Sequence, residues 1–325
     1  MLIPSTLRDL GIDDARAWSI PMTTRFRRIT ERDGLLLHGP AGWSEFSPFW
    51  DYEATESAAW LRAALADATD ERPAPLRREV EVNVTIPVVA PVLAHRLARV
   101  GGARTAKIKV ADPGSSLEED AARLEAVRDA MGPEARLRID ANAAWSRDEA
   151  LAALPVLDRA AGGLEYAEQP CAELEDLAAV RRALDIPIAA DESVRRAEDP
   201  LRVARAEAAD ILVMKVQPLG GVQRCLDLAE QTGLPVVVSS ALESSVGLGA
   251  GLALAAALPD LPHACGLGTA SLLTGDLVEQ PLHTRGGLLP VERREPAPDL
   301  LERHAASDEL AARWQDRLAA CAAQL

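Results

Sequence analysis

Aromatic residues, cysteines and long apolar runs are all scarce in this chain of 325 residues. Phe, Trp and Tyr make up only 3% of it, so we expect a core built mainly from aliphatic side chains. The four cysteines form no CxxC or similar pair, which argues against structural zinc and favours buried, reduced thiols. The longest near-apolar run, residues 246–258, is too short to cross a bilayer and predicts a buried helix.

Basic residues are outnumbered, with 35 Lys and Arg against 50 Asp and Glu, for a net charge of −15. So acidic a chain lacks the basic surface that binds phosphates, and we expect neither nucleic acid nor an anionic membrane as a partner. Arg8 and Asp9 interrupt the N-terminal segment before the apolar core of a signal peptide could form. We therefore expect a soluble, cytoplasmic protein with a small-molecule partner; the sequence leaves its oligomeric state open.

From about residue 82, short apolar segments alternate with amphipathic ones. The eight strands that we expect lie around residue 83 and at residues 106–110, 136–140, 164–168, 187–191, 211–216, 235–240 and 264–268. Ser116 and Ser146 each precede a Glu by three residues, and these capping boxes predict helix starts between strands. The alternation predicts a closed parallel α/β barrel, with an open doubly wound sheet as the alternative. No GxGxxG follows the first strand, which argues against a dinucleotide-binding domain.

The segments on either side of the barrel have a different pattern. Residues 18–40 predict a β-hairpin that turns at Arg32-Asp33-Gly34, and a helix is expected from about Glu53 to Thr69. The tail beyond Leu289 is expected to end in a helix near residues 308–324. These segments predict a small α+β unit that packs against the barrel.

Charged side chains gather at the carboxyl ends of the expected strands, where barrel enzymes carry their active sites. The set comprises Lys107, Lys109, Asp140, Glu168, Asp191 and Lys215. From Lys109 onward, successive members are separated by 23 to 31 residues, about one strand and one helix. Side chains two residues apart on a strand share a face, so Lys107 lies with Lys109, and Arg138 with Asp140. We expect all of them around the mouth of one barrel.

The chemistry follows from these residue types. Asp140, Glu168 and Asp191 offer only hard oxygen donors, which suit Mg²⁺ or Mn²⁺ and not zinc. Such a cation stabilises the negative charge that develops when a proton leaves the carbon next to a carboxylate. A lysine near the cation loses its proton more easily and can act as a base near neutral pH. Lys109 and Lys215, on either side of the carboxylates, are the candidate bases.

Five short motifs, in this order, resemble the lysine-base branch of the enolase superfamily. They are KxK at Lys107, DxN at Asp140, EQP at Glu168, DES at Asp191 and KxQ at Lys215. The resemblance implies a (β/α)₇β TIM-like barrel with an α+β capping domain made from both chain ends. We therefore expect residues 1–81 plus 289–325 to form the capping domain and residues 82–288 the catalytic barrel.

Two further segments, residues 42–49 and 239–247, are similar to the o-succinylbenzoate synthase family. That resemblance implies dehydration of 2-succinyl-6-hydroxy-2,4-cyclohexadiene-1-carboxylate, through an enediolate, in menaquinone synthesis. It implies that Lys109 removes the α-proton and then protonates the leaving hydroxyl, while Lys215 stabilises the enediolate. Lys107 and Arg138 would adjust the local charge. The implied substrate contacts are Arg138, Ser239, Ser240 and Gly266.

Other interpretations remain open from the sequence. An N-acylamino acid racemase or dipeptide epimerase would use the same set, with one lysine on each face of the substrate. A non-catalytic barrel with a binding role would require the whole set to be coincidental. Individually, Asp140 and Asp191 could be helix N-caps, and Arg138 an ordinary ion-pair partner. The arginines at positions 25, 27 and 28 could steer a dianionic substrate or form a solvated face.

Overall fold

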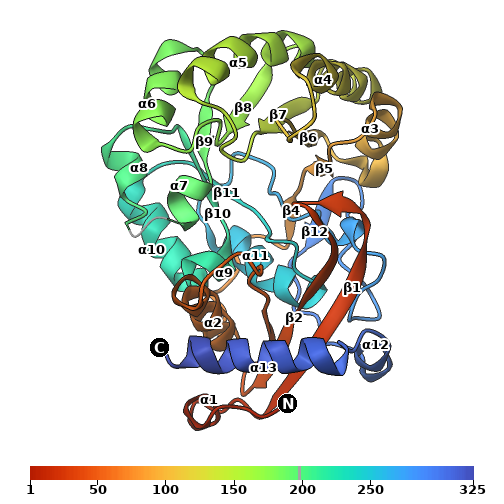
Figure 1. Cartoon of the computed structure of the whole chain (residues 1–325), viewed down its shortest axis with the longest axis vertical. Helices are drawn as coiled ribbons and strands as arrows, with labels where there is room; N and C mark the ends of the chain where they lie inside the picture. Colours follow the sequence, from red (N-terminus) through yellow and green to blue (C-terminus); the bar gives the residue numbers. More distant parts are fainter. Residues whose placement is uncertain (197–198) are drawn as a thin grey trace.

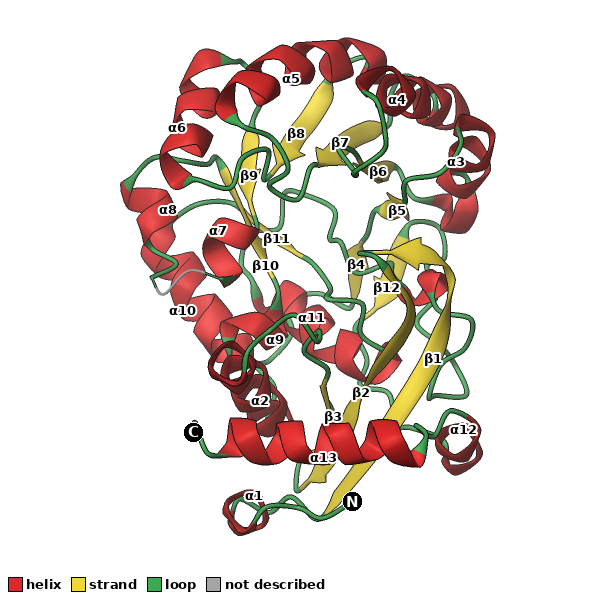
Figure 2. Ribbon diagram, viewed as in Figure 1, coloured by secondary structure: helices red, strands yellow, loops and turns green. Residues whose placement is uncertain are grey.

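The computed structural model describes residues 1–196 and 199–325. Its larger part is a barrel, with strands inside and a ring of helices outside, and its smaller part is a cap formed by both ends of the chain (Figures 1 and 2). Seven parallel strands follow one another around the barrel from β5 to β11. They are β5 (Val84–Ile86), β6 (Thr105–Lys109), β7 (Arg136–Asp140), β8 (Leu164–Glu168), β9 (Ile188–Ala190), β10 (Ile211–Met214) and β11 (Val236–Val238).

The eighth expected strand closes the barrel through two short bridges. Cys265 pairs with Val82 on one side, and Gly266 pairs with Ser239 on the other, both in parallel. The Gly266 amide donates to the Val238 carbonyl at 2.8 Å. The prediction of a closed barrel is thus confirmed, and the doubly wound alternative is wrong.

Helices connect and cover the strands. In order they are α3 (Pro91–Ala98), α4 (Leu117–Met131), α5 (Arg147–Ala161), α6 (Leu174–Ala183), α7 (Glu192–Arg195), α8 (Arg202–Arg205), α9 (Val216–Leu219), α10 (Val222–Thr232) and α11 (Ser245–Ala257), with 3₁₀ turns at Val100–Gly102 and Ala270–Leu272. The capping boxes predicted at Ser116 and Ser146 are present at the starts of α4 and α5. The near-apolar run is buried helix α11, as expected.

Aliphatic side chains form most of the barrel core, between the strands and the surrounding helices. A small separate cluster lies on alternate positions of the strands and includes Tyr166, Ala189 and Val213. The four cysteines, all within the described residues, are buried free thiols. In the described part of the chain, no helix is long and apolar enough to span a membrane.

The cap contains an antiparallel sheet of β1 (Asp14–Phe26), β2 (Ile29–Gly39) and β3 (Gly42–Phe46). Its helices are α1 (Ser5–Asp9) and α2 (Ala54–Thr69), joined by α12 (Pro298–Arg303) and α13 (Asp308–Ala322) from the C-terminal end. Helix α13 crosses the sheet, as Figure 1 shows. A two-stranded ribbon of β4 (Glu79–Glu81) and β12 (Leu288–Pro290) brings together the two positions where the chain passes between cap and barrel. The exact domain limits stay a prediction.

The hairpin turn was predicted at the wrong residues. The chain reverses at Arg27 and Arg28, both with positive φ, between the paired residues Phe26 and Ile29. Positive φ at both central residues is typical of a tight hairpin turn, but this turn normally carries Asn or Gly, so two arginines gave no signal. Gly34 lies inside β2 instead, where a Cβ would come within 2.6 Å of the Ser47 Cβ. It is needed for packing, not for turning.

Candidate active site

Strand register places Lys109, Asp140 and Glu168 at one level of the barrel. Lys109 pairs with Asp140 across β6 and β7, and Asp140 pairs with Glu168 across β7 and β8. Asp191 follows β9 directly, and Lys215 follows β10. The expectation that these side chains surround one mouth therefore holds in the structure. Lys107, Lys109 and Lys215 are also the only lysines in the chain, a feature of the sequence that itself points to this site.

Each carboxylate of this cluster is paired with a lysine. The Lys109 Nζ lies 2.5 Å from Asp140 Oδ2, and Lys107 Nζ lies 2.9 Å from Glu168 Oε1 and 3.1 Å from Asp140 Oδ2. Lys215 forms an ion pair with Asp191. The three carboxylates are at most 1% exposed, so these charges are held almost entirely out of water.

Burial and charge act in opposite directions on these groups. Burial alone would raise the pKa of Asp140, but Lys109 and Lys107 outweigh it and hold that pKa well below its usual value. For Glu168, burial and the neighbouring Asp140 prevail and raise its pKa to about 7. Burial lowers the pKa of Lys215, and the attraction of Asp191 does not fully offset this effect.

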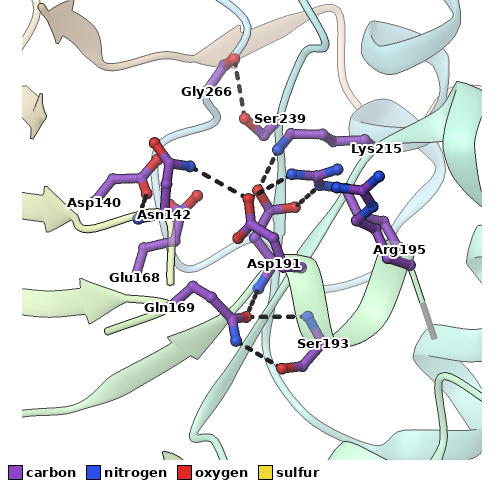
Figure 3. Close-up of polar contacts among 12 residues, drawn as sticks. Asp140, Asn142, Glu168, Gln169, Asp191, Ser193, Arg195, Lys215, Ser239 and Gly266 are labelled. Carbon is purple, nitrogen blue, oxygen red and sulfur yellow. Dashed lines mark hydrogen bonds and ion pairs between the residues drawn. The ribbon is translucent and has the colours of Figure 1, made fainter. Parts of the chain in front are cut away.

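A second set of contacts orients the carboxylates and lysines. Asn142 accepts a hydrogen bond from Lys109 Nζ at 2.6 Å. The Gln169 side chain joins two strand ends, because its Oε1 accepts from the Asp191 amide at 2.9 Å while its Nε2 donates to Ser193 Oγ at 2.6 Å. Asn142 and Gln169 both have positive φ, a strained backbone that is frequent at functional sites. Figure 3 shows this arrangement around Asp191.

Arg195 was not predicted as a site residue. Its Nε donates to Asp191 Oδ1 at 2.8 Å (Figure 3). Its guanidinium also contacts Glu192 and the hydroxyl of Tyr52 from the cap. The guanidinium thus holds one oxygen of Asp191, while Lys215 pairs with the other. The one sequence signal was the spacing of four residues between Asp191 and Arg195, which places them on one face of a helix.

A cavity opens above the cluster, and most of the predicted residues line it. Barrel residues on its wall are Thr85, Lys107, Lys109, Asp140, Asn142, Arg195, Lys215, Ser239, Ser240, Ala241, Leu242, Gly266 and Thr269. The cap contributes Phe26, Arg27 and Phe49. Arg27 belongs to the hairpin turn, whereas Arg25 and Arg28 are outside the lining. Cap and barrel together enclose a cavity lined by charged and polar side chains from the barrel and by two phenylalanines from the cap.

Arg138, predicted as a substrate contact, lies outside this lining. It is fully buried, and its Nε donates to Glu165 Oε2 at 2.6 Å while its Nη1 donates to the Ala264 carbonyl at 2.7 Å. Glu165 in turn contacts His263 at 2.9 Å. Arg138 precedes Asp140 by two residues on β7, so it lies deeper in the barrel. The geometry fits the alternative interpretation, an ion-pair partner.

The donor chemistry of the cluster fits a hard divalent cation. Asp140, Glu168 and Asp191 present carboxylate oxygens alone, with no imidazole or thiolate among them. Within the described residues, no three His, Cys, Asp or Glu side chains converge as a ready ligand set, because ammonium groups lie between these carboxylates. Asp140, Glu168 and Asp191 are the residues that would hold such a cation.

This fold, with lysines and carboxylates at the ends of the barrel strands, defines a two-part enzyme scaffold of the enolase type. The enolase C-terminal domain-like family matches residues 92–296, and the enolase N-terminal domain-like family matches residues 17–68. Solved structures agree in fold: an L-Ala-D/L-Glu epimerase from Bacillus subtilis has a TM-score of 0.73 at 22% identity, over 88% of this chain and 97% of that one. An N-succinyl Arg/Lys racemase from Bacillus cereus has a TM-score of 0.76 at 20% identity, over 91% and 98%.

Sequence relatives narrow the assignment. An o-succinylbenzoate synthase from Thermobifida fusca is 56% identical over 95% of this chain and 96% of its own. Enzymes of the same name are 54% identical in Mycolicibacterium smegmatis, over 93% of both chains, and 49% identical in Mycobacterium marinum, over 98% and 96%. The chain belongs to the o-succinylbenzoate synthase family.

Proposed function

We propose that this protein is a carbon–oxygen lyase that dehydrates 2-succinyl-6-hydroxy-2,4-cyclohexadiene-1-carboxylate to o-succinylbenzoate, a step of menaquinone biosynthesis. The observation that carries the proposal is the identity of 49–56% to enzymes of that name over nearly the whole chain. The cavity supports it, because two lysines face a space closed on one side by aromatic side chains.

Lys109 performs both proton transfers in this reaction. Its neutral amine takes the proton from the ring carbon that bears the carboxylate, and the electrons of that C–H bond move into the carboxylate to give an enediolate. The enediolate then collapses, the bond from the ring to the hydroxyl oxygen breaks, and Lys109 returns its proton so that water leaves. The ring becomes aromatic, and Lys109 ends in its starting state.

Lys215 and Lys107 serve this step by charge. Lys215 lines the cavity from β10, four strands around the barrel from Lys109 on β6, and stabilises the enediolate from the opposite side. Lys107 neutralises the buried Glu168 and Asp140, whose repulsion would otherwise oppose the arrangement. Ser239, Ser240 and Gly266 form the wall that receives the succinyl chain, and Phe26 and Phe49 from the cap line the same cavity.

Asp140, Glu168 and Asp191 would hold a divalent cation, Mg²⁺ or Mn²⁺. When bound, this cation supplies Lewis-acid stabilisation of the second negative charge on the substrate carboxylate. Asn142, Gln169 and Arg195 orient the three carboxylates for that role.

The proposal is tested by following absorbance when purified protein, stripped with EDTA, meets the cyclohexadiene substrate with and without Mg²⁺. The expected result is formation of the aromatic product only when the metal is present. Absence of turnover in protein that demonstrably binds Mg²⁺ would reject the dehydratase assignment.

One alternative reaction is favoured by a specific observation. Lys109 and Lys215 line the same cavity from opposite sides, the arrangement that racemisation of an N-acylamino acid or epimerisation of a dipeptide needs. A polarimetric assay with N-succinyl amino acids separates the reactions, because only a racemase removes their optical activity.

The proposal also includes the domain limits, the location and the partners of the protein. It sets the limits between cap and barrel at residues 81/82 and 288/289. It expects a cytoplasmic protein that binds neither nucleic acid nor membranes.

A further inference from the structure

A second group of buried charges joins the cap to the wall of the cavity. Glu45 lies on β3, Glu243 lies in the turn after β11, and Arg32 lies on β2; all three are at most 5% exposed. The group lies where residues 42–49 meet residues 239–247, the two segments that carry the closer family resemblance. These segments are far apart in the chain, so their contact is a product of the fold.

Glu45 binds the turn directly. Its Oε2 accepts a hydrogen bond from the Ser244 amide at 3.0 Å and another from the Ser244 hydroxyl. Arg32 completes the attachment, because its Nε donates to the Leu242 carbonyl at 3.1 Å and its Nη2 to the Ala241 carbonyl at 3.3 Å. Ala241 and Leu242 line the cavity, so cap side chains set the position of that wall.

Gln217 extends the same network to the segment that carries Lys215. Its Oε1 accepts from the Ser47 amide at 3.1 Å, and its Nε2 donates to Glu243 Oε1 at 3.4 Å. Ser47 Oγ donates to Glu45 Oε1 at 2.6 Å, and Glu243 Oε2 accepts from the Ala241 amide at 2.6 Å. Movement of Glu45 would therefore disturb two walls of the cavity together.

The surroundings of Glu45 are closed and carry few charges. A Cβ on Gly247 would lie 2.8 Å from Glu45 Oε2, so the first turn of α11 packs directly on this carboxyl group. Burial, and then the charge of Glu243, raise the pKa of Glu45 to about 7, against the hydrogen bonds from Ser244 and Ser47 and the charge of Arg32. Burial also raises the pKa of Glu243, which faces Arg32 and Lys215. Glu45 thus changes charge near neutral pH.

We propose that Glu45 is a positioning residue for the dehydration: from capping strand β3, its hydrogen bonds with Ser244 fix the 241–244 turn against the cavity. A second negative charge beside Glu243 would weaken the attachment of the turn, because water cannot screen the repulsion. This inference rests on the proposed function, since the cavity wall matters only for the substrate bound there.

Kinetics of Glu45→Ala and Glu45→Gln test the proposal, with Asp67→Ala as the matched control. Asp67 is also a buried cap carboxylate, paired with Arg72 and remote from the lining. Glu45→Ala should raise KM by about tenfold with a smaller change in kcat, as expected when a binding wall moves. Glu45→Gln keeps the acceptor for Ser244, so it should restore KM and should not lose kcat/KM as the pH rises through 7. A KM in Glu45→Ala equal to that of Asp67→Ala, or a wild-type pH profile in Glu45→Gln, would overturn it.

Amide hydrogen exchange tests the attachment without any substrate. Residues 239–248 should exchange faster in Glu45→Ala than in wild type or Asp67→Ala, and Glu45→Gln should restore protection. If wild type does not turn over the diene, the proposed reaction fails, yet the exchange data still decide whether Glu45 fixes the turn. If Glu45→Ala does not fold, exchange of residues 239–248 is measured against pH in wild type and in Glu45→Gln. The same pH dependence in both proteins would overturn the inference.

Discussion

At the scale of residues, the site is an arrangement of three lysines and three carboxylates that balance one another. Lys107 and Lys109 come from one strand and Lys215 from a strand across the barrel. Removing one buried partner leaves an uncompensated charge, so each substitution has a structural cost as well as a chemical one. Substitutions that keep the charge, such as Lys109→Arg, therefore separate the chemical effect from the structural cost.

Replacement of Lys109 is expected to stop the reaction. Lys109→Ala removes both proton transfers and should lower kcat by at least about 100-fold, measured by absorbance of the aromatic product. Lys109→Arg keeps a cation beside Asp140 but has no accessible neutral form, so it should be equally inactive while folding normally. Turnover by Lys109→Arg near the wild-type rate would contradict the assignment of the base. Arg136→Ala, at an exposed site on β7, is the control that should keep full activity.

Replacement of Asp191 is expected to weaken metal binding. Asp191→Asn removes one of the three proposed carboxylate ligands, and we expect Mg²⁺ affinity by titration calorimetry to fall by roughly 10-fold or more. Asp67→Asn changes a buried carboxylate of the cap and should leave the affinity unchanged. An Asp191→Asn protein that binds Mg²⁺ like wild type would remove Asp191 from the proposed ligands.

At the scale of elements, strand ends hold the charged groups, and capped helices hold the strands in place. The predicted limits of β7 and β8 were correct: β7 alternates charged and apolar residues, and both strands end in an acidic residue. The Arg27-Arg28 turn was missed because arginine does not favour positive φ. Gly34 misled the prediction, because it is required by close packing inside β2 and not by a turn. Local sequence thus identifies elements well, but it identifies unusual turns poorly.

The capping box of α5 allows a test at this scale. Ser146 accepts from the Glu149 amide, and Glu149 Oε2 accepts from the Ser146 amide at 2.8 Å. Ser146→Ala should lower the free energy of unfolding by about 1 kcal/mol in urea titrations, and Ser146→Gly by only a few tenths. The rate should hardly change, because α5 follows β7 on the outside of the barrel. Equal stability of Ser146→Ala and wild type would show that this cap contributes nothing.

At the scale of the whole molecule, cap and barrel share one cavity, and the Glu45 network lies between them. Folding raises the pKa of Glu45 from its ordinary value of 4.5 to about 7, so the folded protein binds this proton more tightly than the unfolded chain. Its contribution to stability is therefore present at low pH and is lost as the pH rises through 7. Relative to Glu45→Gln, wild type should lose about 3 kcal/mol of unfolding free energy between pH 4.5 and pH 7, measured by urea unfolding. A pH-independent difference between the two proteins would contradict this account.

The sequence by itself determined the barrel, its strands and the charged residues at their ends. These features follow from local periodicity and from residue types whose burial is costly unless they have a function. Only the tertiary structure decided which groups meet: the place of Arg138 below the cavity, the contact of Arg195 with Tyr52 of the cap, and the contact of Glu45 with Ser244. The physical reason is that such contacts join residues distant in the chain, and their positions depend on the packing of the whole fold.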